Sequence, residues 1–149
     1  AEESIDELRR SLSMMREDFD LGRAVEDYCR TAAERHGIEV PFSRSGLDRP
    51  VPPDVALSLF RVLQEALTNV ARHSRARRAE VRLEFAGGDI TLSVKVDGRG
   101  FDARAPSAPG HYGLANLRER ARAAGGELRV TSAPGKGTEV RFRAPLRRA

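Results

Sequence analysis

The chain has 149 residues, enough for one domain with a hydrophobic core, and its apolar fraction of 40% is ordinary for a globular protein. Its 26 basic residues outnumber 22 acidic ones to give a net charge of +4. Both signs are spread along the whole sequence, which favours a solvated surface over a nucleic-acid site. No apolar run reaches the length of a membrane span. Cys29, the only cysteine, excludes an intramolecular disulfide and favours a reducing, cytoplasmic compartment.

Helical periodicity dominates the first part of the chain. A helix is predicted over residues 4–18, and because the chain opens inside it, we expect a piece of a longer protein. A second helix is predicted to begin behind Asp20 as N-cap and to end at Gly37 in the Schellman position. The first helix places its large apolar side chains on one stripe, which consists of Ile5, Leu8, Leu12 and Met15.

A short strand is predicted over residues 38–42, followed by a loop rich in proline. The strongest helical pattern of the chain then runs from Pro53 to about Ser74. The core stripe of this long helix is predicted to consist of Leu59, Val62, Leu63, Ala66, Leu67 and Val70.

Strand patterns dominate the second part of the chain. Two consecutive runs joined by Gly87 and Gly88 predict a hairpin, and two further runs are joined by the glycine-rich turn APGKG. The whole order predicts an α+β fold, a two-layer sandwich with helices on one face of a mixed, mostly antiparallel sheet. The predicted elements are strands over 81–85 and 89–96, a loop over 98–112, a helix over 114–124, and strands over 127–132 and 138–144.

The long helix carries a second, polar face. Glu65, Asn69 and Arg72 are spaced i, i+4, i+7, so they lie together, and His73 follows directly. An acid, an amide and a cation in this order could activate a nucleophile, hold Mg²⁺ through an oxygen and contact a phosphate. The alternative is a solvated face with a Glu–Arg pair.

Glycines follow the predicted hairpin. Gly98 and Gly100 allow the backbone to approach a ligand closely, although a tight turn explains them equally well. Gly110, Gly113 and Leu114 then open a helix, whose first amides could receive an anion.

Two apparent motifs are excluded. The segment PGKGT is not a phosphate-binding P-loop, because Lys136 is followed by glycine and strands are predicted on both sides. His36, His73 and His111 lack partners at metal-ligand spacing.

The order of four motifs resembles the ATP-binding catalytic domain of a sensor histidine kinase, of the subgroup related to nitrate and cell-envelope sensors. The motifs are QEALTNVARHS, DGRGF, GHYGLANLRERARAAGG and PGKGT, and the resemblance covers roughly residues 20–145. It implies the Bergerat-type sandwich shared with gyrase-type ATPases, with ATP and Mg²⁺ as ligands. Residues 1–19 would be the end of a dimerisation and phosphoacceptor helix, or a linker, and 20–149 the ATP-binding domain.

The resemblance also implies roles for individual residues. Glu65 corresponds to the acid that polarises the attacking group, and Asn69 to the Mg²⁺-binding amide. Residues 101–112 would form a mobile lid. The expected nucleotide contacts are Arg72 and His73 at the phosphates, Val96, Asp97, Gly98 and Gly100 beside the adenine, Gly110, Gly113 and Leu114 at the second glycine box, and Thr138 at the adenine end.

Val96 departs from the family pattern. The family has an aspartate at this position, which accepts the adenine amino hydrogen, and valine has no acceptor. Asp97 cannot replace it in a regular strand, because neighbouring residues face opposite sides of a sheet. The alternative reading is therefore a degenerate nucleotide site that serves as a regulatory or protein-interaction module.

The phosphoacceptor histidine of the family is a second departure, since no histidine here precedes an acidic residue. The expected partners are the dimerisation and phosphoacceptor domain of the same kinase and, indirectly, a response regulator. We expect no nucleic acid, no direct membrane contact and a monomeric fragment. A stand-alone ATPase or an anti-sigma-type kinase is a third reading.

Overall fold

The protein is described by a computed structural model that carries side chains for most of the chain. The side chains of residues 2–4, 6–7, 70–73 and 111–114 fall outside the description. The residues described are 2–16, 18–73, 77–98, 111–132, 135 and 137–146.

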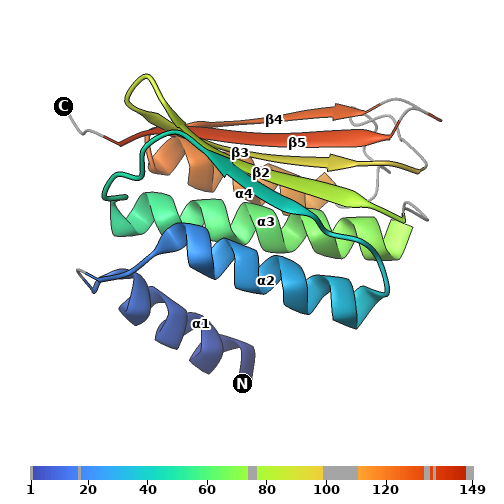
Figure 1. Ribbon diagram of the computed structural model, residues 1–149, viewed down its shortest axis with the longest axis horizontal. Coiled ribbons are helices and arrows are strands. Elements are labelled where there is room, and N and C mark those ends of the chain that lie inside the picture. The colour runs from blue at the N-terminus through green and yellow to red at the C-terminus, as the bar shows by residue number, and fades with distance from the viewer. Residues whose placement is uncertain are drawn as a thin grey trace.

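One layer of helices covers one face of a five-stranded sheet, as Figure 1 shows. The strand order is β1-β2-β3-β5-β4, in which β1 and β2 are parallel and the other neighbours antiparallel. The predicted two-layer α+β sandwich with a mixed sheet is thus confirmed. The elements are α1 (Glu2–Met14), α2 (Leu21–His36), β1 (Phe42–Ser45), α3 (Pro53–His73), β2 (Ala79–Ala86), β3 (Asp89–Val96), α4 (His111–Ala123), β4 (Glu127–Ser132) and β5 (Thr138–Pro145).

The core lies between the sheet and α3. Alternate strand residues point toward the helices, so that one row across the sheet consists of Val81, Val94, Val140 and Val130. The long helix supplies the opposing surface, and its predicted core stripe is confirmed as far as the description of side chains reaches. Its fully buried members are Leu59, Val62, Leu63, Ala66 and Leu67.

The ends of α2 are fixed by local capping, as predicted. The Asp20 carboxylate accepts a hydrogen bond from the Arg23 N–H at 3.1 Å. At the other end, Gly37 N–H and Ile38 N–H both donate to the Ala33 carbonyl, at 3.0 and 3.3 Å. Both boundaries are therefore determined by the residues that flank the helix.

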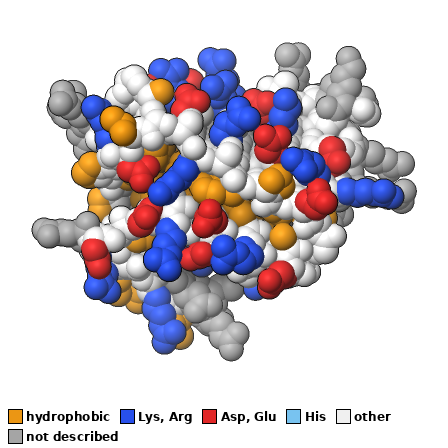
Figure 2. All heavy atoms as spheres, viewed as in Figure 1, with side chains coloured by type: hydrophobic (Ala, Val, Ile, Leu, Met, Phe, Trp, Pro, Cys, Tyr) orange, Lys and Arg blue, Asp and Glu red, His pale blue; other side chains and the backbone are white. Residues whose placement is uncertain are grey.

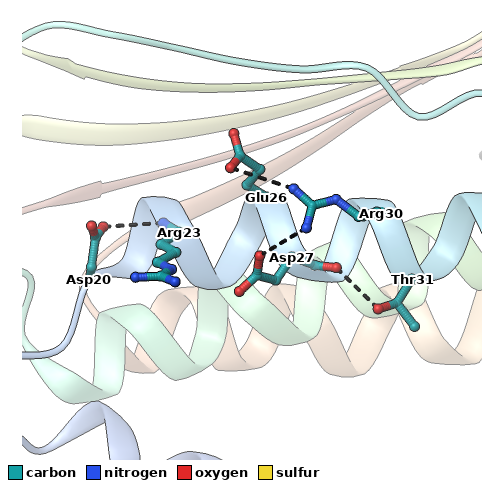
Figure 3. A network of polar contacts seen from close by, with 6 residues as sticks. All are labelled: Asp20, Arg23, Glu26, Asp27, Arg30 and Thr31. Atoms are coloured by element: carbon teal, nitrogen blue, oxygen red, sulfur yellow. Dashed lines mark hydrogen bonds and ion pairs between the residues drawn. The ribbon is translucent and has the colours of Figure 1, made fainter.

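The exposed face of α2 carries mixed charges (Figure 3). Arg30 lies 4.0 Å from Glu26 and 3.7 Å from Asp27, and Thr31 Oγ1 donates to the Asp27 carbonyl at 3.1 Å. Figure 2 shows the same interspersion of basic and acidic side chains over this side of the molecule. Exposed ion pairs of this kind contribute little to stability. The surface here carries acidic and basic side chains side by side.

Three predicted elements have a boundary that is wrong by three residues or more. The first strand is β1 (Phe42–Ser45), beyond the predicted 38–42, where only Glu39 forms an isolated bridge to Arg78. Continuous pairing with β2 begins after Pro41, which has no N–H to donate. The first helix ends at Met14 instead of residue 18, and α4 begins at His111 instead of residue 114.

The first helix is held to the domain by the side opposite its predicted stripe. Met14 is buried, and the Arg10 guanidinium lies 4.5 Å from the ring centre of Phe60 on α3, a cation–π contact. Phe60 in turn meets Tyr28 of α2 edge-on. The stripe itself faces away from the domain and consists of the exposed residues Ile5, Leu8, Leu12 and Met15.

Among the helices described, none combines the length and apolar character needed to cross a bilayer.

Candidate functional site

The candidate site lies at one end of the sandwich. The C-terminal half of α3, the end of β3, the turn between β4 and β5, and the start of α4 are all found at this end (Figure 1). The antiparallel topology brings them together, because β3 and β4 end where β2 and β5 begin. Segments distant in the sequence can thus contribute to one site.

Glu65 and Asn69 provide the polar groups of α3. They are one helical turn apart and half-buried, and neither makes an ion pair or hydrogen bond with the residues described. Arg72 and His73 lie in the last turn of the same helix, with side chains outside the description. A carboxylate and an amide oxygen are thus available at this end of α3.

Val96 lies in the last row of the inner face of the sheet. It pairs with Ala79 on one side and Thr138 on the other, and Thr138 pairs with Ser132. Val96 is only 4% exposed, whereas Thr138 and Ser132 are half-buried. The row thus consists of two buried apolar side chains with a pair of half-buried hydroxyls at one side.

Asp97 faces away from that row and has a structural contact. Its Oδ1 accepts hydrogen bonds from the backbone N–H groups of Arg77 and Arg78, both at 3.0 Å. The carboxylate joins the end of β3 to the segment that enters β2.

Ser132 was not among the residues predicted from the sequence. Its Oγ donates to the Gly137 carbonyl at 3.0 Å and lies 2.8 Å from Thr138 Oγ1. The period-two alternation that places Leu128 and Val130 on the inner face also places Ser132 there. The inward position of Ser132 could have been predicted from this alternation.

Only some of the predicted glycines of the site lie among the described residues. Gly98 has a φ of 99°, which favours glycine, and a Cβ on Gly137 would lie 2.4 Å from the Val96 carbonyl oxygen. The β4–β5 turn therefore needs glycine to approach the end of β3. Gly113 and Leu114 lie in the first turn of α4, with side chains outside the description. Gly100, Gly110 and residues 101–110 of the predicted lid (101–112) lie outside the described residues, whereas residues 111–112 belong to α4 and not to a loop.

Other reactive groups are not part of this site. Burial raises the pKa of the Cys29 thiol to about 12, with a smaller contribution from Glu26, so Cys29 is not an activated nucleophile. Among the residues described, no cluster of three His, Cys, Asp or Glu could hold a metal ion. A cation at Asn69 would take an amide oxygen and complete its shell with substrate phosphate and water.

Comparison with known proteins identifies a family. Residues 54–148 match the family described as histidine kinase-, DNA gyrase B- and HSP90-like ATPases. The chain is 31% identical over 147 residues to the signal transduction histidine-protein kinase/phosphatase DegS of Brevibacillus brevis. The match covers 96% of this chain and 38% of that protein. It is 36% identical over 135 residues to the sensor histidine kinase NarS of Mycobacterium tuberculosis, covering 89% of this chain and 31% of NarS.

A solved structure agrees in fold. The histidine kinase domain of the Erythrobacter litoralis EL346 blue-light activated histidine kinase superimposes with a TM-score of 0.67 at 27% identity, over 85% of this chain and 61% of that one. The present chain spans little more than a third of the length of DegS.

Proposed function

Because the chain belongs to the family of histidine kinase-, DNA gyrase B- and HSP90-like ATPases and is the ATP-binding domain of a sensor histidine kinase, we propose that it binds Mg-ATP and transfers the γ-phosphoryl group. The acceptor is a histidine on a separate dimerisation domain of the same kinase. A response regulator receives the phosphoryl group afterwards. The domain works in the cytoplasm.

The observation that carries the proposal is the Glu65–Asn69 pair. Both side chains are half-buried at the end of α3 and have no partner among the residues described. An acid and an amide one helical turn apart, with side chains still open to solvent, can bind a polar ligand at this position.

Each residue has a distinct role in this proposal. Glu65 accepts the proton of the attacking group, and Asn69 holds Mg²⁺, which neutralises charge on the phosphates when bound. Arg72 and His73, in the last turn of α3, contact the phosphates in this proposal. Thr138 meets the base at the other side of the site. The protein contributes mainly positioning and charge stabilisation.

Substitution of Glu65 tests the proposed catalytic role. In the full-length kinase, Glu65→Gln should lower autophosphorylation by roughly 10²- to 10⁴-fold, because general base catalysis is lost. Mg-ATP affinity and the melting temperature should change little, since the side-chain volume is kept. Glu84→Gln, on the outward face of β2, is the matched control. Unchanged autophosphorylation in Glu65→Gln would remove the role assigned to this residue.

A second candidate function rests on Val96. A domain that has lost its acceptor for adenine could serve as a regulatory or protein-interaction module. Val96→Asp distinguishes the two: a degenerate site binds Mg-ATP only after this substitution, whereas a working site binds it before. Calorimetric titration of both forms measures the difference.

A further inference from the structure

Asp97 links two segments that the proposed function assigns to the nucleotide. It follows Val96 at the end of β3, and Gly98, the first glycine of the predicted loop, comes directly after it. Its Oδ1 accepts hydrogen bonds from the backbone N–H groups of Arg77 and Arg78, both at 3.0 Å. These two residues belong to the segment that leaves α3 and enters β2. One side chain therefore joins the end of β3 to the exit of α3.

The same segment is also held from its other side. The Arg77 carbonyl oxygen accepts a hydrogen bond from Glu39 N–H at 2.9 Å, and Ala79 N–H donates to the Glu39 carbonyl at 2.8 Å. Asp97 N–H donates to the Arg78 carbonyl at 3.2 Å. Arg77 is thus fixed between the residues that precede β1 and the end of β3.

The position of Arg77 affects α3 because the connection between them is short. Only three residues separate Arg77 from His73, the last residue of α3, and α3 ends beside the start of β2 (Figure 1). Asn69 lies one helical turn before His73. A displacement of Arg77 is therefore passed on to the part of α3 that carries Asn69. Displacements of about 1 Å are enough to impair a site that depends on precise positioning.

We propose that Asp97 is a positioning residue, whose carboxylate fixes the last turns of α3 so that Asn69 meets Mg²⁺ on the phosphates of ATP. This inference rests on the proposed function, since it requires Mg-ATP at the end of α3. The carboxylate acts through α3, because both of its N–H donors belong to the segment that follows this helix.

A double-mutant cycle between Asp97 and Asn69 tests this role. ATP is titrated calorimetrically, with Mg²⁺ and with the metal chelated, into the wild type, Asp97→Ala, Asn69→Ala and the double variant. Asp97→Ala should weaken Mg-ATP binding by about 3- to 10-fold in the wild-type background and by less than about 2-fold in the Asn69→Ala background, where the contribution through Asn69 is already lost. Without metal, Asp97→Ala should change the affinity by less than about 2-fold, for the same reason.

Further variants separate positioning from a loss of stability. Asp97→Asn keeps an oxygen that can accept both N–H groups, and it should stay within about 2-fold of the wild-type affinity. Asp20→Ala removes the N-cap of α2 at the opposite end of the sandwich, and it should destabilise the domain without weakening Mg-ATP binding. If Asp97→Ala does not fold, Asp97→Ser takes its place in the cycle, because its oxygen lies one bond closer to the backbone and cannot reach both N–H groups.

The outcomes distinguish this inference from the proposed function. Wild-type affinity in Asp97→Ala, or equal weakening in both backgrounds or with and without Mg²⁺, would show that Asp97 does not act through Asn69, while ATP binding stands. Equal weakening in Asp20→Ala would attribute the effect to stability alone. If the wild type binds no ATP, the proposed function falls together with the inference. A loss confined to Mg-ATP and to the background with Asn69, with retention in Asp97→Asn, supports the inference.

Discussion

Val96 and Asp97 are consecutive residues at the end of β3, and their side chains point to opposite faces of the sheet. Val96 is buried on the face toward the helices, whereas Asp97 uses one carboxylate oxygen to accept two backbone N–H groups. The Asp97 carboxylate therefore contributes to the fold. Thr138 is the cross-strand partner of Val96 in the inner row of the sheet.

Asp97→Ala should destabilise the domain. The N–H groups of Arg77 and Arg78 lose a charged acceptor, at a cost of about 1–3 kcal/mol. Asp97→Asn keeps an acceptor oxygen and should lose less. Urea denaturation of the three proteins gives the free energies of unfolding. Equal stability of Asp97→Ala and the wild type would show that these hydrogen bonds do not support the fold.

For single residues, the sequence predicts the sheet or helix face on which a side chain lies better than it predicts the partners of that side chain. Alternation along β3 was enough to place Val96 inward and Asp97 outward, and helical spacing placed Glu65 beside Asn69. The contacts of Asp97 and Ser132 could not be predicted. Both depend on how the chain returns to the sheet: Asp97 contacts the entry to β2, and Ser132 contacts the start of β5.

The start of α2 is the element whose stability depends most clearly on one side chain. Asp20 caps the helix, and its Oδ1 also lies 3.4 Å from Arg44 Nη1, while Arg44 Nη2 lies 3.4 Å from Asp48. Arg44 thereby links the helix start to the loop before α3. A change at Asp20 affects both the cap and this link.

Asp20→Ala should lower the free energy of unfolding by about 1–2 kcal/mol, the usual cost of losing an N-cap with a small added contribution from the exposed ion pair. Asp18→Ala is the matched control. Among the residues described, its carboxylate meets only the highly exposed Arg16, at 3.3 Å, so the substitution should cost less than about 0.5 kcal/mol. Thermal melting of the two variants side by side provides the measurement. Similar losses in both would contradict the capping role.

Element boundaries follow the same distinction between local and distant causes. Both ends of α2 were predicted correctly because its caps lie within a few residues of the helix. The first strand was misplaced because its limits are set by parallel pairing with β2, about forty residues away in sequence. The start of α4 was also missed, since Gly113 in HYGLAN disfavours a helix in isolation.

Two regions stand out at the scale of the whole molecule, the candidate site and the exposed stripe of α1. The candidate site lies where α3 ends, while α1 packs outside the α2–α3 layer with its apolar stripe exposed (Figure 1). The fold class, the sheet order at the level of hairpins, and the location of the site on α3 follow from periodicity and motif order. That residues 1–19 are the end of a dimerisation helix stays a prediction.

The central claim, that this domain binds Mg-ATP through the end of α3, is tested most directly by calorimetric titration of ATP with Mg²⁺ and again with the metal chelated. We expect saturable binding at one site in the presence of Mg²⁺. Asn69→Ala should weaken binding with Mg²⁺ by about 10-fold or more and leave metal-free binding nearly unchanged, because Asn69 acts through the cation. Absence of binding by the wild type, or an equal effect of Asn69→Ala with and without Mg²⁺, would contradict it.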